Sequence, residues 1–213
     1  MQFFLDSANL DDARRAMELG FVDGVTTNPS LMAAAGRPPL DVLDDLLETT
    51  PGPVFFQMTA HSLNEREQDA YTASERYVDR VVIKLPATTE NMTLAHKLVA
   101  DGLLVCITAV SHPSQAMLAG NVGAAYIAPY VNRLTQQMGD GLRVLSDCVK
   151  VLEGTSTQVL AASLKSTDEA VAAVLAGASA ITIPLDLILA ISEHELTYKA
   201  IAQFDEAVVL PST

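Results

Sequence analysis

Val81-Val82-Ile83-Lys84-Leu85-Pro86 is an apolar run that carries one lysine. Runs that are apolar on both faces are typical of parallel strands, because the crossover helices cover both sides of such a sheet. A lysine in this setting either extends its ammonium to water or is buried. Burial lowers the pKa of the amine toward the range where its neutral form is a nucleophile. Lys84 is therefore either the polar end of a buried strand or a lysine suited to Schiff-base chemistry.

Seven other short runs are typical of β-strands and alternate with longer segments that mostly have apolar residues at i, i+3 and i+4 spacing. No Pro/Gly/Ser-rich linker divides the chain, so we expect a single domain over residues 1–213, with an extra helix from about residue 194. The predicted strands are 2–6, 24–28, 54–59, 81–86, 104–110, 125–130, 158–163 and 180–185, and the predicted helices include 10–19, 40–47, 63–77, 89–100, 141–152 and 167–176.

A repeated punctuation pattern supports parallel strands with helical crossovers. Leu118-Ala119-Gly120 precedes a strand that leaves through Pro129, and Leu175-Ala176-Gly177 precedes one that leaves through Pro184. Eight such units of roughly 25 residues predict an α/β fold, a compact (β/α)8 or TIM barrel. The alternative is an open doubly wound sheet, which normally has a glycine-rich turn after its first strand. Residues 5–9, Leu5-Asp6-Ser7-Ala8-Asn9, contain no glycine.

The composition narrows the classes of function. A net charge of −13 argues against nucleic acid as a partner, because nucleic-acid binding needs a basic face. No apolar stretch is long enough to span a bilayer, and the acid at Asp6 comes too early for a secretory signal, so we expect a cytoplasmic protein without membrane partners. Cys106 and Cys148 are expected as buried thiols. An anionic substrate would have to be bound by a few specifically placed cations.

Polar side chains gather where the predicted strands end. In a barrel these ends meet at one face, where the chemistry of such folds takes place. Each residue alone has a structural explanation, such as a helix cap, a strand former or a partner for backbone groups. Together we expect them to surround Lys84. They are Asp6, Thr26, Thr27, Asn28, Gln57, Lys84, Thr108, Tyr130, Arg133, Ser163 and Lys165.

Five motifs resemble those of the transaldolase family, specifically its short members, which include the fructose-6-phosphate aldolases. The resemblance runs from Met1 to about Phe204. It implies a (β/α)8 barrel, a Schiff-base lysine at Lys84, no metal or organic cofactor, and a homo-oligomeric ring, a pentamer or decamer. The motifs are Leu5-Asp6-Ser7-Ala8-Asn9, Gly24-Val25-Thr26-Thr27-Asn28-Pro29-Ser30, Val82-Ile83-Lys84-Leu85-Pro86, Ala128-Pro129-Tyr130-Val131-Asn132-Arg133 and Ala161-Ala162-Ser163-Leu164-Lys165.

Two positions separate the branches of this family. Transaldolases typically carry Glu and Phe where this chain has Gln57 and Tyr130, and the aldolase branch carries Gln and Tyr. The resemblance therefore implies an aldolase that acts on the C3–C4 bond of ketose phosphates such as fructose 6-phosphate, with dihydroxyacetone-type donors. Gln57, Thr108 and Tyr130 would hold water or supply the proton around the imine, and Asp6 would act on the sugar C4 hydroxyl or orient Lys84.

The substrate-binding residues are predicted from charge and placement. Arg133 can hold phosphate oxygens bidentately, and Ser163 adds a hydroxyl group. Lys165 is a weaker candidate, since it also fits an exposed charge before a helix that starts near Ser166. Asn28 is expected to hydrogen-bond Lys84 or the substrate hydroxyls. Thr26 completes the predicted substrate-binding set.

Other functions stay open. A transaldolase that transfers a dihydroxyacetone unit between sugar phosphates is the runner-up. Outside the family, a phosphosugar isomerase would need a carboxylate base where this chain has Lys84. A sugar-binding protein without catalytic activity would not need the set of polar side chains at the strand ends. The histidines have no metal-ligand spacing, so no metal site is predicted, and His112 before Pro113 is typical of a helix start; they are His61, His96, His112 and His194.

Overall fold

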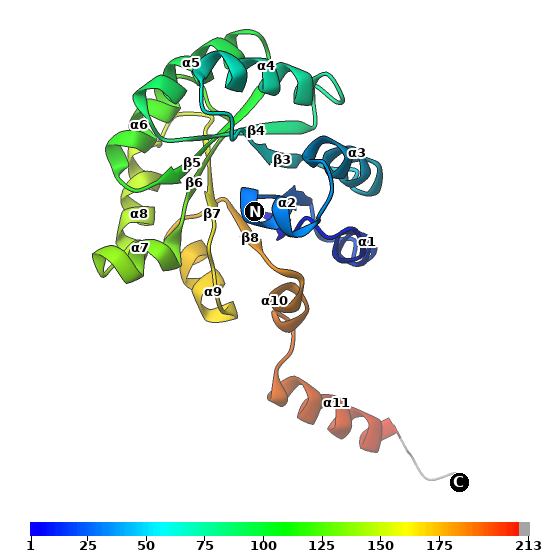
Figure 1. The fold of residues 1–213 in the computed structure, drawn as a ribbon. Helices are drawn as coiled ribbons and strands as arrows, with labels where there is room; N and C mark the ends of the chain where they lie inside the picture. The colour runs from blue at the N-terminus through cyan, green and yellow to red at the C-terminus, as the bar shows by residue number, and fades with distance from the viewer. Residues whose placement is uncertain (209–213) are drawn as a thin grey trace.

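The computed structural model describes residues 1–208, and in this part of the chain eight parallel strands close into a barrel in the order β1 to β8. Figure 1 shows the helices arranged around the strands. The predicted (β/α)8 fold is confirmed, and the open-sheet alternative is wrong because β1 pairs with both β2 and β8. The strands are β1 Gln2–Asp6, β2 Gly24–Thr26, β3 Val54–Gln57, β4 Val81–Pro86, β5 Leu104–Val110, β6 Tyr126–Pro129, β7 Gln158–Ala161 and β8 Ala180–Ile183.

The helices include short elements that the sequence analysis did not predict. Pro29, Pro113 and Leu185 each open a helix directly after a strand or its turn, and proline at the first helical position is favoured because its missing N–H would have no partner there. His112 caps the helix that starts at Pro113, as predicted. The helices are α1 Leu10–Glu18, α2 Pro29–Ala34, α3 Pro39–Thr49, α4 Leu63–Ser74, α5 Thr89–Ala100, α6 Pro113–Asn121, α7 Val131–Met138, α8 Gly141–Val151, α9 Thr167–Leu175, α10 Leu185–Ala190 and α11 Glu195–Val208.

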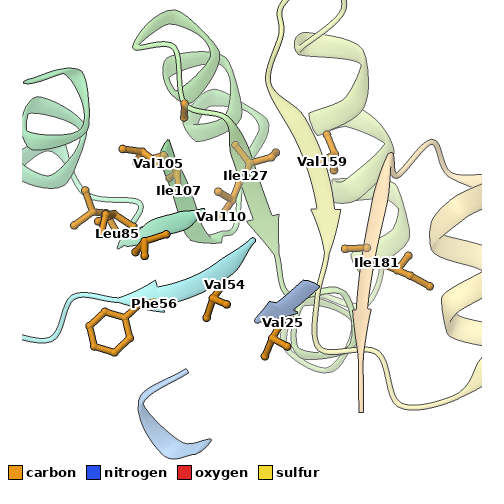
Figure 2. Close-up of a cluster of buried hydrophobic side chains, with 14 of the residues drawn as sticks. Val25, Val54, Phe56, Leu85, Val105, Ile107, Val110, Ile127, Val159 and Ile181 are labelled. Atoms are coloured by element: carbon orange, nitrogen blue, oxygen red, sulfur yellow. The ribbon is translucent and has the colours of Figure 1, made fainter. Parts of the chain in front are cut away.

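Strand alternation divides the apolar residues into two layers. Outward side chains such as Val25, Val54, Ile107 and Ile181 pack under the helices (Figure 2). Inward side chains form a separate cluster inside the barrel, built around Phe4, Phe55 and Tyr126. The rings of these three are arranged edge to face, with centroids 5.1 Å apart for Phe4 and Phe55 and 5.0 Å apart for Phe55 and Tyr126. The barrel therefore has a filled apolar interior at this level.

The inner face changes from apolar to polar along six of the strands, β1, β3, β4, β5, β6 and β8. Asp6 follows Phe4 by two positions, and Gln57 follows Phe55 in the same way. Because side chains two positions apart lie on the same face of a strand, the polar residues stand above the aromatic cluster, toward the carboxyl ends of the strands. The same offset places Lys84 after Val82, Thr108 after Cys106, Tyr130 after Ala128 and Thr182 after Ala180.

Helix α11 lies apart from the barrel. In Figure 1 it extends away from the strands after α10. Its apolar side chains are exposed, among them Leu196 and Phe204, each 65% exposed. Among residues 1–208, none of the helices combines the length and the apolar composition that crossing a bilayer requires.

Candidate active site

The polar side chains at the carboxyl ends of the strands line a cavity of about 550 Å³. All of the predicted catalytic and substrate-binding residues except Thr108 reach this cavity, although they are spread over more than 150 positions of the sequence. Thr108 is fully buried beside it. Of the other residues expected around Lys84, Lys165 lines the cavity and the buried Thr27 does not. The predicted residues on the wall are Asp6, Thr26, Asn28, Gln57, Lys84, Tyr130, Arg133 and Ser163.

Lys84 is a buried amine in the wall of this cavity. Its side chain lies on β4 between β3 and β5, opposite Gln57 and Cys106, and the residue is 6% exposed. Its Nζ donates a hydrogen bond to the carbonyl oxygen of Thr27 at 2.5 Å. Burial lowers the pKa of Lys84, and the Cys106 thiol and the Asp6 carboxylate act in the opposite direction. The neutral, nucleophilic form of the amine is thus favoured relative to an exposed lysine.

Asp6 is the carboxyl group that acts electrostatically on Lys84. Burial raises the pKa of Asp6, while Lys84 and a hydrogen bond from Thr26 act to lower it. Thr26 Oγ1 donates to Asp6 Oδ1 at 3.1 Å and lies 2.6 Å from Thr182 Oγ1, so three adjacent strands, β8, β1 and β2, form one polar network. The network fixes the orientation of the carboxyl group on the cavity wall.

A second polar group combines Thr108, Tyr130 and Gln57. Thr108 Oγ1 and Tyr130 Oη lie 2.7 Å apart, which joins β5 to the residue that follows β6. Burial raises the pKa of Tyr130, although the Thr108 hydrogen bond lowers it, so the phenol keeps its proton at neutral pH. Gln57 Oε1 is buried and has no hydrogen-bond partner among residues 1–208. An unsatisfied buried acceptor is costly, so this oxygen is suited to bind a donor in the cavity.

Cations are found on the side of the cavity formed by the loops after β6 and β7. Arg133 and Lys165 line the cavity, and within residues 1–208 neither forms an ion pair with an acidic side chain. The guanidinium carbon of Arg133 lies 4.8 Å from the centre of the Tyr130 ring. Ser163 lies on the same wall. In a chain with a net charge of −13, these unpaired cations mark a place for an anion.

The backbone is strained at two points of the cavity wall. Ala109 has a φ of 56° and Ser163 a φ of 60°, and they are the only non-glycine residues with positive φ in the described part of the chain. The register between β5 and β6 shifts between Thr108 and Val110, around Ala109. Left-handed conformations are unfavourable for such residues and are concentrated at functional sites, where surrounding contacts hold them.

Asn28 does not make the contact with Lys84 that the sequence analysis allowed for. Its Oδ1 accepts from the backbone N–H of Leu31 at 3.0 Å and caps α2, while Lys84 bonds to the carbonyl of the preceding Thr27. The capping bond is available because the predicted strand 24–28 ends at Thr26 and the chain turns into α2 directly. Asn28 still lines the cavity, so contact with substrate hydroxyls stays a prediction.

Several cavity residues were missed or given little weight. Lys165 is an exposed charge directly before Ser166, the cap of α9, which was the alternative explanation for it. It nevertheless also lines the cavity. Thr182 was not singled out, although it follows the inner-cluster residue Ala180 by the same two positions as the other polar side chains. The Thr27 carbonyl gives no signal in the sequence, because any residue type has one.

A second cavity of about 560 Å³ lies beside α1 and the segment from α2 to α3. Its arginines, Arg14 and Arg37, are exposed and paired with Asp11 and Asp45. This second cavity lacks a buried ionisable group like Lys84, so the cavity at the strand ends is the better candidate. Within residues 1–208, no three His, Cys, Asp or Glu side chains come together as a metal site would require.

Comparisons with known proteins agree with this geometry. A family described as "Transaldolase/Fructose-6-phosphate aldolase" matches residues 3–210. The relatives include a "Probable transaldolase" of Hydrogenobaculum sp. (strain Y04AAS1), 35% identical over 96% of this chain and 94% of that protein. Another, of Anaeromyxobacter dehalogenans (strain 2CP-C), is 37% identical over 96% of this chain and 94% of its own length.

A solved structure supports the fold alone. An inosine 5′-monophosphate dehydrogenase from Legionella pneumophila superposes with a TM-score of 0.61 at 16% identity, over 86% of this chain, and the chain spans only 58% of that protein. By its fold and its site, the chain is a TIM-barrel protein with a buried lysine at the carboxyl ends of the strands. Within that class, the chain belongs to the transaldolase/fructose-6-phosphate aldolase family, with aldolase-type chemistry on carbohydrates.

Proposed function

We propose that the protein is a class I aldolase that forms a Schiff base through Lys84 and cleaves or forms the C3–C4 bond of ketose phosphates such as fructose 6-phosphate. The observation that carries this proposal is the burial of Lys84 in the wall of a polar cavity, which lowers the pKa of its amine. The family supports aldol chemistry over the isomerase alternative. The roles below are assigned from the contacts of the residues.

The first stage is formation of the imine. Neutral Lys84 Nζ attacks the C2 carbonyl carbon of the ketose, and the carbonyl oxygen becomes the hydroxyl group of a carbinolamine. That hydroxyl group takes up a proton and leaves as water, which produces a protonated imine. Tyr130, held by Thr108, is suited to supply the proton, and the buried Gln57 Oε1 is suited to accept a hydrogen bond from the departing water.

The second stage breaks the carbon–carbon bond. Asp6 accepts the proton of the C4 hydroxyl group, the C3–C4 electron pair moves toward the protonated imine, and the fragment from C4 to C6 leaves as glyceraldehyde 3-phosphate. The remaining fragment is an enamine bound to Lys84. Until the bond breaks, the protonated imine carries a positive charge close to Asp6, and this charge favours the ionised carboxylate that the step requires. Burial of free Asp6 favours its neutral form instead.

The fate of the enamine separates the two candidate functions. If C3 takes up a proton and water then adds to C2, dihydroxyacetone is released and the enzyme is an aldolase. If the enamine attacks a second aldehyde instead, the enzyme is a transaldolase. The phenol of Tyr130 favours the first outcome. The phenolate left by imine formation regains a proton from water, and the restored phenol, which keeps its proton at neutral pH, can give it to C3. The names of the relatives favour the second.

The cationic wall supports a phosphorylated substrate. Arg133 can bind two phosphate oxygens in parallel, and Ser163 and Lys165 offer further donors from the loop after β7. Asn28 and Thr26 face the sugar part of the cavity, so we assign them to the hydroxyl groups of the substrate. In the proposed complex, the carbonyl end of the substrate lies at Lys84 and its phosphate group lies at Arg133.

The test supplies fructose 6-phosphate with and without erythrose 4-phosphate and measures glyceraldehyde 3-phosphate. An aldolase releases this product without the acceptor, together with one equivalent of dihydroxyacetone. Strict dependence on erythrose 4-phosphate would identify the transaldolase. Absence of product under both conditions, at a level equal to Lys84→Met, would contradict both functions.

We also propose that the protein assembles as a homo-oligomer, a pentamer or decamer. Helix α11 supports this, because its apolar side chains are exposed and gather on one side of the helix. Leu196, Ala200 and Phe204 follow one another at intervals of four residues, and Ile201 lies beside them. A second copy of the chain is the occupant we assign to this side of α11.

A further inference from the structure

Glu169, near the start of α9, joins α7, the helix after β6, to the loop that follows β7. Its Oε1 accepts a hydrogen bond from Asn132 Nδ2 on α7 at 2.7 Å, and its Oε2 accepts from the backbone N–H of Lys165 at 2.7 Å. Its own backbone N–H donates to Ser166 Oγ, the cap of α9, at 3.1 Å. One side chain therefore bonds to both segments, and its bond to Asn132 spans 37 positions of the sequence.

This use of the carboxylate differs from the usual capping arrangement. In a capping box, the acid at the third helical position accepts from the backbone N–H of the cap residue itself. Helix α4 has that arrangement, with Glu65 Oε2 accepting from Ser62 N at 3.2 Å. Glu169 instead directs both oxygens away from the cap residue, toward the loop before it and toward α7. The Glu169 carboxylate therefore does not cap α9 in the usual way, and it connects other segments instead.

The segments that Glu169 joins carry the cationic wall of the cavity. Arg133 follows Asn132 directly, and Lys165 is itself one of the bonded residues. The backbone N–H of Asn132 also donates to the carbonyl oxygen of Ser163 at 3.2 Å. Ser163 has a left-handed backbone, which needs surrounding contacts to persist. Glu169 does not line the cavity with these three residues.

We infer that Glu169 is a positioning residue for phosphate recognition: it fixes the spacing of Arg133, Ser163 and Lys165 from outside the cavity. The inference rests on the proposed function, in which these residues bind the substrate phosphate. A carboxylate close to an anion site would normally repel the ligand. Here the Glu169 carboxylate accepts hydrogen bonds from two donors, so it can hold α7 and the loop after β7 together.

The experiment measures binding of inorganic phosphate by calorimetry and steady-state kinetics with fructose 6-phosphate, for wild type, Glu169→Ala and Glu65→Ala. Loss of two hydrogen bonds from a charged acceptor is expected to weaken phosphate binding and raise KM on the order of tenfold in Glu169→Ala. We expect kcat to stay within about twofold, because Lys84 is untouched. Glu65→Ala removes the same side chain from a cap away from the cavity and should leave both measurements unchanged.

A reciprocal exchange separates positioning from a general loss of stability. Asn132→Asp alone places two carboxylates against each other and should weaken phosphate binding. Asn132→Asp combined with Glu169→Gln restores an amide–carboxylate bond with the roles reversed, keeps the net charge and leaves an amide oxygen for Lys165 N. This double variant should recover phosphate binding to within about threefold of wild type. A double variant weaker than either single variant would overturn the inference.

Trapping with dihydroxyacetone and borohydride keeps the inference distinguishable from the proposed function. Dihydroxyacetone has no phosphate, so Glu169→Ala should form the Lys84 adduct as wild type does. Wild-type phosphate binding and KM in Glu169→Ala would overturn the inference and leave the aldolase proposal standing. Absence of the adduct in wild type would contradict the aldolase proposal. The phosphate titration would still decide the role of Glu169 in that case. A wild-type protein that does not bind phosphate would overturn that role.

Discussion

The hydroxyl oxygen of Thr108 lies 2.7 Å from the phenol oxygen of Tyr130, across the neighbouring strands β5 and β6. The threonine is fully buried, so the hydrogen bond holds the phenol in one position on the cavity wall. Burial raises the pKa of Tyr130 and keeps its proton available at neutral pH. The pair therefore combines a fixed position with a proton that can be given to substrate.

Tyr130→Phe should selectively damage aldol cleavage. Removal of the phenol takes away the proposed acid for the enamine, and general acids contribute about 100-fold or more to rate. We expect cleavage of fructose 6-phosphate without an acceptor to fall by at least that factor, and by more than transfer to erythrose 4-phosphate, because transfer needs no proton at C3. The measurement is the rate of glyceraldehyde 3-phosphate release under each condition.

Tyr126→Phe is the matched control for this substitution. Tyr126 points into the same barrel from β6, the strand that Tyr130 follows, and its hydroxyl group donates to Gln2 Oε1 at 3.1 Å, at the opposite end of the interior. The deletion is chemically identical but lies away from the cavity, so both rates should stay near wild type. Equal rates in Tyr130→Phe and wild type would remove Tyr130 from the mechanism.

Asp6→Asn should separate imine formation from bond cleavage. The Asp6 carboxylate raises the pKa of Lys84, against the larger lowering by burial, so its removal lets the Lys84 pKa fall further. We expect the pH midpoint for borohydride trapping with dihydroxyacetone to move to lower pH in Asp6→Asn. Cleavage should decrease by about 100-fold or more, since the base for the C4 hydroxyl is lost. A midpoint that moves to higher pH would contradict the coupling of the two groups.

Lys84→Met should stabilise the fold while it abolishes activity. The folded pKa of Lys84 lies below its unfolded value, so between the two values the unfolded chain holds more protons and the free energy of unfolding rises with pH. The burial penalty is complete below the folded pKa and disappears toward 10.5, the ordinary value. Replacement by Met should add on the order of 1 kcal/mol near neutral pH, or about 2–4 °C in Tm.

Lys150→Met provides the comparison for the stability measurement. Lys150 has a side chain that is 66% exposed, so this substitution should change Tm little at any pH. The gain in Lys84→Met should shrink as the pH is raised from 7 toward 10. A constant gain over this range would mean that packing, and not the charge of the amine, causes it.

Phe204→Asp should weaken the proposed assembly. Phe204 is 65% exposed on the apolar side of α11, and a charge there would be buried if a second copy covered it. Light scattering should show an oligomer for wild type and smaller species for Phe204→Asp. Ala202→Asp adds the same charge two residues before Phe204, on the opposite side of α11, and should leave the mass unchanged. A wild-type monomer would contradict the assembly.

The sequence was sufficient for the barrel and for most of the cavity wall. The strands are apolar on both faces and repeat with helical crossovers, and their polar residues come at the strand ends, where a barrel brings them together. Asp6, Gln57, Lys84 and Tyr130 could therefore be placed around one site before any contact was known. The side of the strand on which each one lies follows from its two-residue offset from an apolar residue.

Other features depend on contacts that no local pattern reports. Asn28 was expected to hydrogen-bond Lys84 or the substrate hydroxyls. It does not bond to Lys84, because the strand before it is shorter than predicted and its side chain caps α2. The bond between Asn132 and Glu169 joins residues on different helices, and each alone resembles an ordinary polar surface residue. The left-handed backbone of Ser163 also had no sequence signal, since that conformation is normally associated with glycine.

Borohydride reduction in the presence of dihydroxyacetone, followed by peptide mass analysis, tests the amine most directly. The dihydroxyacetone unit should become attached to the peptide that contains Lys84, with one adduct for each chain, and Lys84→Met should carry none. An unmodified wild-type chain, or an adduct that persists in Lys84→Met, would contradict the account.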